Sequence, residues 1–311
     1  MSKAVRKPVV WGKPITFSIE PTNFCNLECP ECPSGLGALT RPLGLLKFEN
    51  FKNVIDEIHG HCFYIQLFFQ GEPYINKELS QMIKYAQSKN IYVSISTNGL
   101  LINEKKVDFI LDNAPDKLIF SIDGLDEKSY QNYRVGGTFK EADSALRLFI
   151  QKKKERNLKK PFVEFQFIVM KQNEHQIEKV FDYGKEVGID KVVLKTMQVS
   201  SYENAINYLP ENEDYRRYIV ADGKVKMKGK MENHCFALWR TSVVTWDGKI
   251  VPCCFDKDAK YELGLLNGKT FDEIWNSDKY YKFRKAVLKN RKGIDMCTNC
   301  TEGLKINIVE E

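Results

Sequence analysis

The chain has 311 residues, of which 43% are apolar and 28% are charged. This length predicts two domains or one barrel with an appended module, and the apolar content excludes an intrinsically disordered chain. The net charge of +6 is the small difference between 47 basic and 41 acidic residues spread along the sequence, so no nucleic acid partner is expected. Neither a signal-peptide pattern nor a run of about 18 apolar residues is found, which predicts a cytoplasmic protein with no membrane partner.

The first two thirds of the chain alternate between β-rich and amphipathic helical segments. After an N-terminal extension over residues 1–14, six strands are predicted near residues 16–20, 64–70, 92–97, 117–123, 162–170 and 191–197. Helical segments such as residues 49–58 and 76–89 separate them. This order is typical of parallel strands joined by crossover helices, so the fold class is α/β, with a core over residues 15–199.

One face of the predicted strands is polar. A sheet that is covered by helices on both faces should be uniformly apolar, because successive side chains point to opposite faces. Either these strands are exposed on one side, or the sheet curves around a polar cavity as in a partial (β/α) barrel, which we favour. The side chains with this shared parity are Thr16, Ser18, Glu20, Gln66, Gln70, Ser94, Ser96, Asn98, Ser121, Asp123, Glu164 and Gln166.

The alternation stops near residue 200. Residues 200–234 show no strand pattern and are predicted to be a connecting segment. Residues 241–254 predict a β-hairpin that turns at Asp247-Gly248, because Asp-Gly between apolar β-rich runs is a strong turn signal. Residues 271–288 are predicted to form one helix. We therefore expect a second, small hairpin-plus-helix domain over residues 235–311.

The nine cysteines lie mainly near the two ends of the chain. In a reducing compartment this points to metal binding or catalysis before disulfides. Cys25, Cys29 and Cys32 follow the first predicted strand with the spacing C-x3-C-x2-C. Three thiolates can hold one iron–sulfur cluster and leave one iron free to bind a small molecule. Zinc, the structural alternative, prefers four ligands, and the nearest histidine in the sequence is His59.

This cysteine loop resembles the signature of the radical S-adenosylmethionine superfamily, which follows the first strand of a partial (β/α)6 barrel. The resemblance covers about residues 15 to 197 and implies a catalytic [4Fe–4S] cluster and bound S-adenosylmethionine. The sequence Gln-Gly-Glu-Pro at residues 70–73 resembles the family's Gly-Gly-Glu-Pro motif, with Gln70 in place of the first glycine. By this resemblance, Gly71, Glu72 and Pro73 form the site of the methionine amino group, with Glu72 as its acidic partner.

Other segments resemble the family's contacts to the ribose and the methionine carboxylate. Ser96 and Asn98 belong to Ser-Thr-Asn-Gly at residues 96–99, and Ser121 and Asp123 belong to Ser-Ile-Asp-Gly at residues 121–124. Hydroxyl, amide and carboxylate groups suit hydrogen bonding to these parts of the cofactor. Arg134 is implied to contact the methionine carboxylate. The family often has an aromatic residue before the third cysteine, where this chain has a glutamate at position 31.

A second set of thiols lies near the C-terminus: Cys235, Cys253, Cys254, Cys297 and Cys300. Four thiols complete a [4Fe–4S] site, although a structural zinc ion also suits four cysteines that include a C-x2-C pair. The pattern resembles the auxiliary-cluster modules called SPASM and Twitch, in which a cysteine, a Gly-x4-Cys hairpin and a later C-x2-C pair follow the barrel.

Because no cysteine follows Cys300, we expect a single auxiliary [4Fe–4S] cluster, as in the shorter Twitch pattern. Its expected ligands are Cys235, Cys253, Cys297 and Cys300. Cys254 points away from the cluster if the strand is regular, whereas a bulge would exchange it with Cys253. The ninth cysteine, at position 62, is predicted to be a buried core thiol.

The resemblance implies that the reduced cluster cleaves S-adenosylmethionine to methionine and a 5′-deoxyadenosyl radical, which removes a substrate hydrogen atom. If the auxiliary cluster accepts the remaining electron, the net reaction is a two-electron oxidation. This predicts an oxidoreductase that acts on a small molecule and receives electrons from an external donor such as flavodoxin or ferredoxin. Glu164 or Glu20 could accept the proton if either faces the cavity.

Two other functions stay open from the sequence. Many relatives with such modules modify peptides or proteins, although only about fourteen residues precede the first strand here, too few for a separate peptide-binding domain. From a different class, the chain could be a non-catalytic iron–sulfur electron carrier or scaffold, against which Glu72 and the ribose-edge motifs weigh. The substrate, a small molecule or a peptide, is not identified by the sequence.

Overall fold

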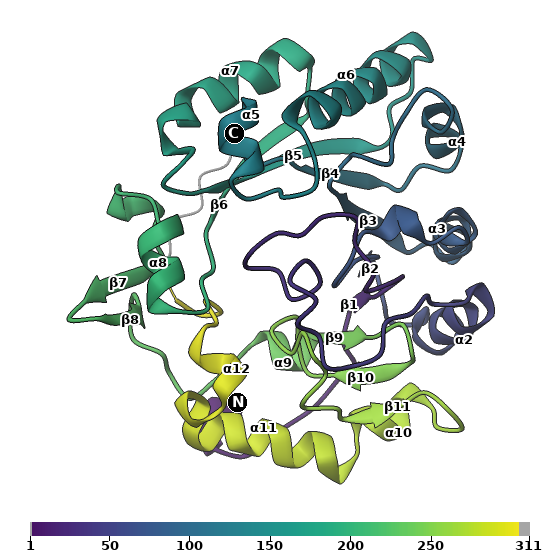
Figure 1. Cartoon of the computed structure of the whole chain (residues 1–311). Coiled ribbons are helices and arrows are strands. Elements are labelled where there is room, and N and C mark those ends of the chain that lie inside the picture. Colours follow the sequence, from purple (N-terminus) through teal and green to yellow (C-terminus); the bar gives the residue numbers. More distant parts are fainter. Residues whose placement is uncertain (1, 305–311) are drawn as a thin grey trace.

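The computed structural model describes residues 2–304, and a nine-stranded sheet forms their centre. The sheet has the order β11-β10-β9-β1-β2-β3-β4-β5-β6, and β1 to β6 are parallel (Figure 1). All six strands predicted from the sequence are confirmed, most of them slightly shorter. They are β1 (Thr16–Ile19), β2 (Tyr64–Gln66), β3 (Tyr92–Thr97), β4 (Lys117–Ser121), β5 (Phe162–Val169) and β6 (Lys191–Thr196).

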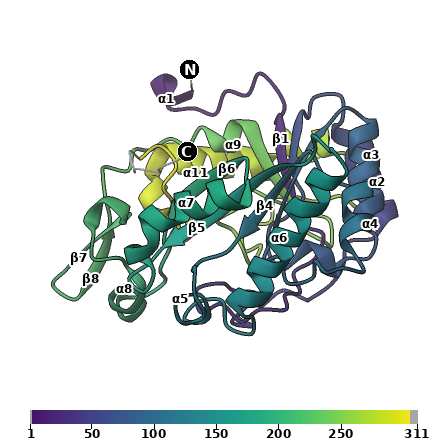
Figure 2. The ribbon, with the colours of Figure 1, turned by 90° about the horizontal axis from the view of Figure 1, so that it is seen from above.

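The helices that connect these strands lie along the outer, convex side of the curved sheet (Figures 1 and 2). Their buried residues recur at helical spacing, as in α2, where Phe51, Val54, Ile55 and Ile58 face the sheet side. The long crossover helices are α2 (Phe48–Ile58), α3 (Leu79–Ser88), α4 (Val107–Asp112), α6 (Phe139–Glu155) and α7 (Ile177–Val187). Within residues 2–304, no helix combines the length and hydrophobicity needed to cross a bilayer.

The two faces of the sheet differ as the strand parity predicts. Phe17, Ile65, Ile95, Phe120 and Phe165 belong to the main hydrophobic core, together with the outer helices. Side chains of the opposite parity line a cavity on the concave side: Ser18, Gln66, Ser96, Ser121 and Gln166. The expected partial barrel with a polar interior is therefore confirmed, and its sheet is open at the edge strands β6 and β11.

The C-terminal hairpin joins the same sheet. β9 (Thr241–Val244) pairs in parallel with β1, and β10 (Lys249–Val251) returns antiparallel to β9 and pairs with β11 (Gly264–Leu265). The predicted turn at Asp247-Gly248 is confirmed, and Gly248 has the positive φ of +82° that glycine tolerates. The pairing of β1 with β9 has no local sequence signal, and it joins the barrel and the C-terminal hairpin in a single continuous sheet.

Two predictions for the C-terminal third are wrong. The single helix expected over residues 271–288 is two helices, α10 (Phe271–Trp275) and α11 (Asp278–Asn290), because the Ser277 hydroxyl accepts the Tyr280 N–H and starts a new helix. The segment 200–234, expected to lack strands, contains α8 (Tyr202–Tyr208) and an antiparallel hairpin of β7 (Tyr218–Ala221) and β8 (Lys224–Met227).

The remaining short elements complete the connections. They are α1 (Ser2–Val5), η1 (Pro73–Ile75), α5 (Glu127–Gln131), η2 (Glu174–Gln176), η3 (Glu213–Tyr215), α9 (Ala237–Arg240), η4 (Arg291–Gly293) and α12 (Asp295–Thr298).

Candidate active site

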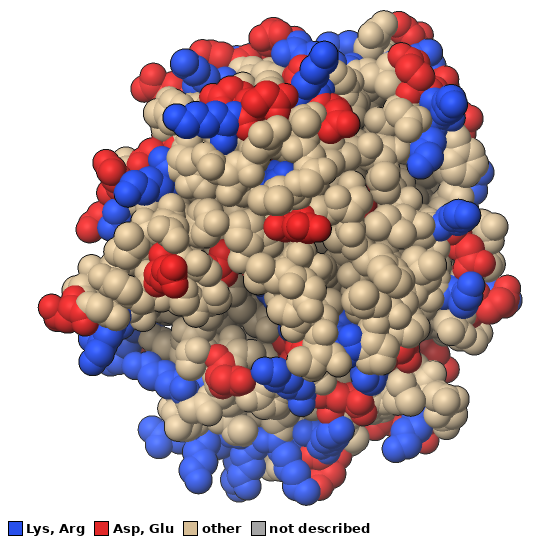
Figure 3. All heavy atoms as spheres, in the orientation of Figure 1, with Lys and Arg blue, Asp and Glu red and all other residues tan. Residues whose placement is uncertain are grey.

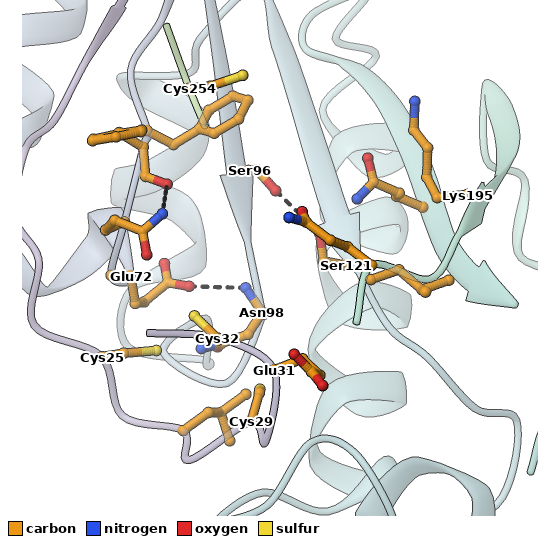
Figure 4. A pocket seen from close by; sticks show the side chains of 18 of the residues that line it. Cys25, Cys29, Glu31, Cys32, Glu72, Ser96, Asn98, Ser121, Lys195 and Cys254 are labelled. Atoms are coloured by element: carbon orange, nitrogen blue, oxygen red, sulfur yellow. Dashed lines mark hydrogen bonds between the residues drawn. The ribbon is translucent and has the colours of Figure 1, made fainter. Parts of the chain in front are cut away.

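A cavity of about 520 Å³ lies on the concave side of the sheet, where the cysteine loop after β1 folds over the strand ends (Figure 4). This volume is in the usual range for small-molecule sites. The cavity brings together most of the site residues predicted from the sequence. Those that line it are Cys25, Cys29, Cys32, Gly71, Glu72, Ser96, Asn98, Ser121 and Arg134.

The cysteine loop is fixed by hydrogen bonds at both sides. The Glu28 N–H donates to Val135 O at 2.8 Å, and Asn98 Nδ2 donates to Asn26 Oδ1 at 2.9 Å. Figure 4 shows the side chains of Cys25, Cys29 and Cys32 gathered at one end of the cavity.

The three thiols of this loop suit a positively charged group. The pKa of Cys25 is raised to about 11, mainly by burial and to a smaller extent by the charges of Glu72, Cys32 and Cys29. Bound iron would supply the positive charge that stabilises the thiolates. No three metal-binding side chains among the described residues lie close enough to share one ion, whereas a four-iron cluster spans a wider space. The loop therefore fits an iron–sulfur cluster.

Gly71 is required where the second motif packs against this loop. Its φ is +73°, and a Cβ there would lie 2.4 Å from Phe24 O and 2.7 Å from Thr22 O. The neighbouring Glu72 N–H donates to the same Phe24 O at 2.8 Å. Only a residue without a side chain fits position 71.

Glu72 is held in place by three hydrogen bonds. Its Oε1 accepts from Thr97 Oγ1 at 2.8 Å and from the Tyr74 N–H at 3.2 Å, and its Oε2 accepts from the Asn98 N–H at 2.8 Å. Burial raises the pKa of this carboxyl to about 6, with the hydrogen bonds acting in the opposite direction. The carboxylate is therefore mostly ionised at neutral pH and is suited to bind an ammonium group in the cavity.

Arg134 is already paired with Asp123. Its Nε and Nη2 lie 2.7 and 2.6 Å from Asp123 Oδ2, and Asp123 Oδ1 accepts the Ile168 N–H at 2.7 Å. Asp123 is fully buried and is not among the residues that line the cavity. Arg134 lines the cavity beside Cys29, whose thiol it influences. Asp123 therefore orients the guanidinium from outside the cavity. Pro73, another residue expected at the cofactor site, also does not line the cavity.

Neither glutamate expected as a proton acceptor faces the cavity. Glu20 is fully buried and forms a bidentate pair with Arg41 at 2.7 and 2.5 Å. Glu164 Oε2 lies 2.5 Å from Lys117 Nζ. The residues that line the cavity do not include either of them. The proposed role of Glu20 or Glu164 as a base required that the side chain face the cavity, and neither residue lines it.

Four charged residues that the sequence reasoning did not select also line the cavity: Glu31, Lys195, Arg217 and Lys257. Glu31 stands in the cysteine loop, and Lys195 lies in a strand that was predicted. Arg217 and Lys257 come from segments whose position beside the cavity depends on tertiary structure. Only Glu31 and Lys195 could have been predicted as cavity residues from the positions of the strands and the cysteine loop.

The C-terminal cysteines form a second cluster of thiols. Cys297 and Cys300 are buried, and the charges of Cys235 and Cys300 act on Cys253. Buried Arg291 donates from Nη2 to Cys300 Sγ at 3.3 Å. Its guanidinium also donates to the carbonyl oxygens of His234 and Glu302, and it would stabilise the ionised form of the neighbouring thiols. Such a donor set fits an anionic iron–sulfur cluster.

Cys254 has a different position from its neighbour. It lines the cavity, as Figure 4 shows, and its thiol is also influenced by Cys300 and Cys235. Cys253 does not line the cavity. The two adjacent thiols thus differ in their surroundings. Both lie beyond β10, which ends at Val251, so the regular strand on which the prediction for Cys254 depended does not reach them.

Comparison with protein families agrees with this geometry. Residues 19–184 match the radical SAM superfamily, and residues 235–301 match the SPASM iron–sulfur cluster-binding domain. The chain belongs to the radical SAM superfamily. It is a radical SAM enzyme that uses a [4Fe–4S] cluster and S-adenosylmethionine and carries a further iron–sulfur-binding domain.

Relatives of known function are distant but cover nearly the whole chain. The tungsten-containing aldehyde ferredoxin oxidoreductase cofactor-modifying protein of Pyrococcus furiosus is 24% identical, over 91% of this chain and 86% of its own. A cysteine-type anaerobic sulfatase-maturating enzyme of Clostridium perfringens is 26% identical over the same shares. The solved structure of BtrN in complex with AdoMet and 2-DOIA covers 94% of both chains, with a TM-score of 0.59 and 18% identity. The last comparison shows a shared fold.

Proposed function

We propose that this enzyme removes a hydrogen atom from a small molecule bound in the concave cavity and completes a two-electron oxidation. Residues 15–199 would form the catalytic barrel and residues 235–311 the auxiliary domain, joined by residues 200–234. When bound, the cluster and S-adenosylmethionine would supply a 5′-deoxyadenosyl radical that takes the hydrogen atom. An external electron donor such as flavodoxin or ferredoxin is part of the proposal.

We assign residues to these groups from the family resemblance, and their common place in the cavity supports the assignment. Cys25, Cys29 and Cys32 would hold the catalytic cluster, and Glu72 would bind the ammonium of S-adenosylmethionine. Ser96, Asn98 and Ser121 offer hydroxyl and amide groups to its ribose and carboxylate. Arg134, oriented by Asp123, lines the cavity and would bind the same carboxylate.

The observation that supports the oxidation is that one C-terminal cysteine, Cys254, lines the same cavity. Cys254 lines it, and its neighbour Cys253 shares electrostatic contacts with Cys235 and Cys300. We propose Cys235, Cys253, Cys297 and Cys300 as ligands of one auxiliary [4Fe–4S] cluster. A cluster at this position would be close enough to the substrate to accept the second electron.

Oxidation also needs a group that accepts a proton from the substrate. With Glu20 and Glu164 outside the cavity, its lining carboxylates are Glu31 and Glu72. Glu72 is already engaged by three donors and is assigned to the cofactor. Glu31 accepts weaker contacts of 3.2 Å from the Ser200 N–H and hydroxyl. We therefore assign proton acceptance to the carboxylate of Glu31.

Modification of a peptide or protein is the second candidate. It is favoured by the similarity to the sulfatase-maturating enzyme, whose name describes action on a protein. The fold of BtrN, solved with AdoMet and 2-DOIA and spanning nearly the same length as this chain, favours a small molecule. The two candidates share the catalytic cluster and differ in the substrate.

The test begins with the anaerobically reconstituted protein. Roughly eight irons per chain and formation of 5′-deoxyadenosine after addition of S-adenosylmethionine and dithionite are expected. The low-molecular-mass and protein fractions of a cell extract are then added separately. Stimulation of 5′-deoxyadenosine formation by the first fraction, with a product two hydrogens lighter, supports the oxidation. Stimulation by the protein fraction alone would favour peptide modification. If no 5′-deoxyadenosine forms under any condition, the alternative of a non-catalytic electron carrier or scaffold would be favoured.

Glu31→Gln tests the proton acceptor in the same assay. Product formation should fall by about 10²- to 10⁴-fold, the usual contribution of a general base. Cleavage of S-adenosylmethionine in the absence of substrate should continue. Unchanged product formation in this variant would remove Glu31 from the mechanism.

A further inference from the structure

Basic side chains gather in the region of the cavity that adjoins the C-terminal cysteines. Lys195 lies on β6, Arg217 directly precedes β7, and Lys257 follows the β9–β10 hairpin. The charge of Cys300 acts on Arg217, and Lys257 acts on Cys254. Three separate segments of the chain thus each contribute a cation to the lining of the cavity.

The figures show how this region opens. In Figure 4 the side chain of Lys195 extends away from Cys25 and Cys29. Its ammonium lies at about the same height in the view as Cys254. In Figure 3 the same face of the molecule is hollowed, and basic side chains lie along the lower left edge of the hollow. A charged molecule can therefore approach this region of the cavity from solvent.

These cations lack a carboxylate partner among residues 2–304. Lys195 and Lys257 are half-buried residues, and their ammonium groups form no hydrogen bond or ion pair there. Arg217 donates from Nε to Thr196 Oγ1 at 3.0 Å and from Nη2 to Thr196 O at 2.7 Å. These bonds to neutral oxygens fix the guanidinium, and no carboxylate of residues 2–304 is paired with it.

The carboxylates of the cavity do not neutralise this region. Glu72 lies beside Cys25 and accepts three hydrogen bonds, and Glu31 bonds to Ser200. The groups whose charges bear on Arg217 are Tyr218 and Cys300, neither of which is a carboxylate. Burial also lowers the pKa of Arg217, as expected for a guanidinium removed from water without a counterion. A bound anion would offset this cost.

We propose that Lys195 and Arg217 form a subsite for an anionic group of the substrate, a phosphate or a carboxylate, with Lys257 adding a third positive charge. This inference rests on the proposed function, because the substrate occupies the same cavity. The planar guanidinium suits two parallel hydrogen bonds to either oxyanion. The anionic end would bind near the C-terminal cysteines, and the portion of the substrate that loses hydrogen would point toward the cysteine loop.

The experiment uses reconstituted protein saturated with S-adenosylmethionine and two simple probes. Binding of inorganic phosphate is followed by phosphorus NMR and binding of acetate by saturation-transfer NMR. Lys195→Gln and Arg217→Gln should each weaken binding of the preferred anion by about tenfold or more. Lys224→Gln is the matched control, because it removes an exposed charge from the β7–β8 hairpin without altering the cavity. It should change binding by less than about twofold.

The preference between the probes identifies the anion: tighter phosphate binding indicates a phosphorylated substrate, and tighter acetate binding a carboxylate. The subsite is overturned if neither probe binds, or if Lys195→Gln leaves binding unchanged. It is also overturned if Lys195→Gln weakens S-adenosylmethionine instead, because the cation would then serve the cofactor. Formation of 5′-deoxyadenosine is measured in the same preparations, so failure of the radical chemistry is distinguished from failure of the anion subsite.

Discussion

Nη2 of Arg291 lies 3.3 Å from Sγ of Cys300, and the charges of Cys235 and Cys297 also act on this buried guanidinium. A positive charge and a hydrogen bond at a ligand sulfur favour the reduced form of an iron–sulfur cluster. Arg291→Gln should therefore lower the reduction potential of the auxiliary cluster, on the order of tens of millivolts.

Potentiometric titration followed by electron paramagnetic resonance would measure the effect of Arg291→Gln. The potential of the N-terminal cluster in the same sample is the internal control. Arg284 offers a matched variant, because it is also buried but contacts the rings of Trp275 and Tyr280. An equal shift in Arg284→Gln would show that loss of any nearby buried charge suffices and would contradict the specific role of Arg291.

Glu72 should make the stability of the folded protein depend on pH. Its folded-state pKa of about 6 lies above the ordinary value of 4.5, so the folded protein binds the proton more tightly than the unfolded chain. Stability from this group is present below pH 4.5 and is lost as the pH rises through 6, by about 2 kcal/mol. Glu72→Gln should flatten this region of the stability curve, measured by denaturant unfolding of the cluster-free protein between pH 4.5 and 7.

Binding of S-adenosylmethionine should show the opposite trend. The cofactor ammonium requires the ionised carboxylate, so affinity should rise between pH 5 and 8 in the wild-type reconstituted protein and lose this dependence in Glu72→Gln. Equilibrium binding under anaerobic conditions measures both. Equal affinity of the variant and the wild type at pH 8 would remove Glu72 from the cofactor site.

Gly71→Ala should displace the cysteine loop. The new methyl group would lie 2.4 Å from Phe24 O, in addition to the cost of about 1–2 kcal/mol for a left-handed residue with a side chain. We expect loss of about four irons per chain while the C-terminal site remains filled. Gly37→Ala is the control, because φ there is +62° with no atom within 4 Å of the new Cβ. Equal iron loss in both variants would assign the effect to backbone strain alone.

Glu164→Gln and Glu20→Gln should lower the stability of the protein by different amounts, and neither should abolish substrate oxidation in the folded protein. Glu164 pairs with Lys117, whose side chain is 23% exposed, so its loss should cost less than about 1 kcal/mol. Glu20→Gln leaves Arg41 buried without its carboxylate and should cost about 3–5 kcal/mol. Denaturant unfolding measures both. Loss of substrate oxidation in a fully folded Glu164→Gln protein would restore this residue as a candidate base.

Cys253→Ser and Cys254→Ser test which adjacent thiol binds the auxiliary cluster. Because Cys254 lines the cavity and Cys253 does not, only Cys253→Ser should lose about four irons. Iron and sulfide analysis after anaerobic reconstitution measures this. The reverse result would assign Cys254 as the ligand in place of Cys253.

The barrel and its polar interior could be predicted because their signals are local. Alternation between apolar and polar residues places Ser18, Gln66 and Ser96 on one face regardless of how the strands pair. The Asp222-Gly223 turn of the β7–β8 hairpin carries the same signal as Asp247-Gly248, and both of its residues have positive φ. The sequence therefore contained the information for this hairpin, although the weak strand pattern around it obscured the turn.

Other features depend on contacts that no local pattern records. Glu20 shares the parity of the cavity residues, yet Arg41 from the following loop binds it and removes it from the cavity lining. Arg217 reaches the cavity through its bonds to Thr196, which is twenty-one positions away in the sequence. Such pairings between distant charged residues are decided by tertiary packing, and the same holds for the choice of the proton acceptor.

The pairing of β1 with β9 affects how the protein is made. Thr16 aligns with Thr241, so the strand that leads into the cysteine loop cannot gain its second neighbour until the ribosome has synthesised most of the chain. Contacts with such a large sequence separation slow folding. During this delay the edge of β1 is open to pairing with other chains, and the thiols after it lie next to an incomplete sheet. The sheet beside the first cysteine loop is thus complete only after the domain that carries the second set of cysteines has been synthesised.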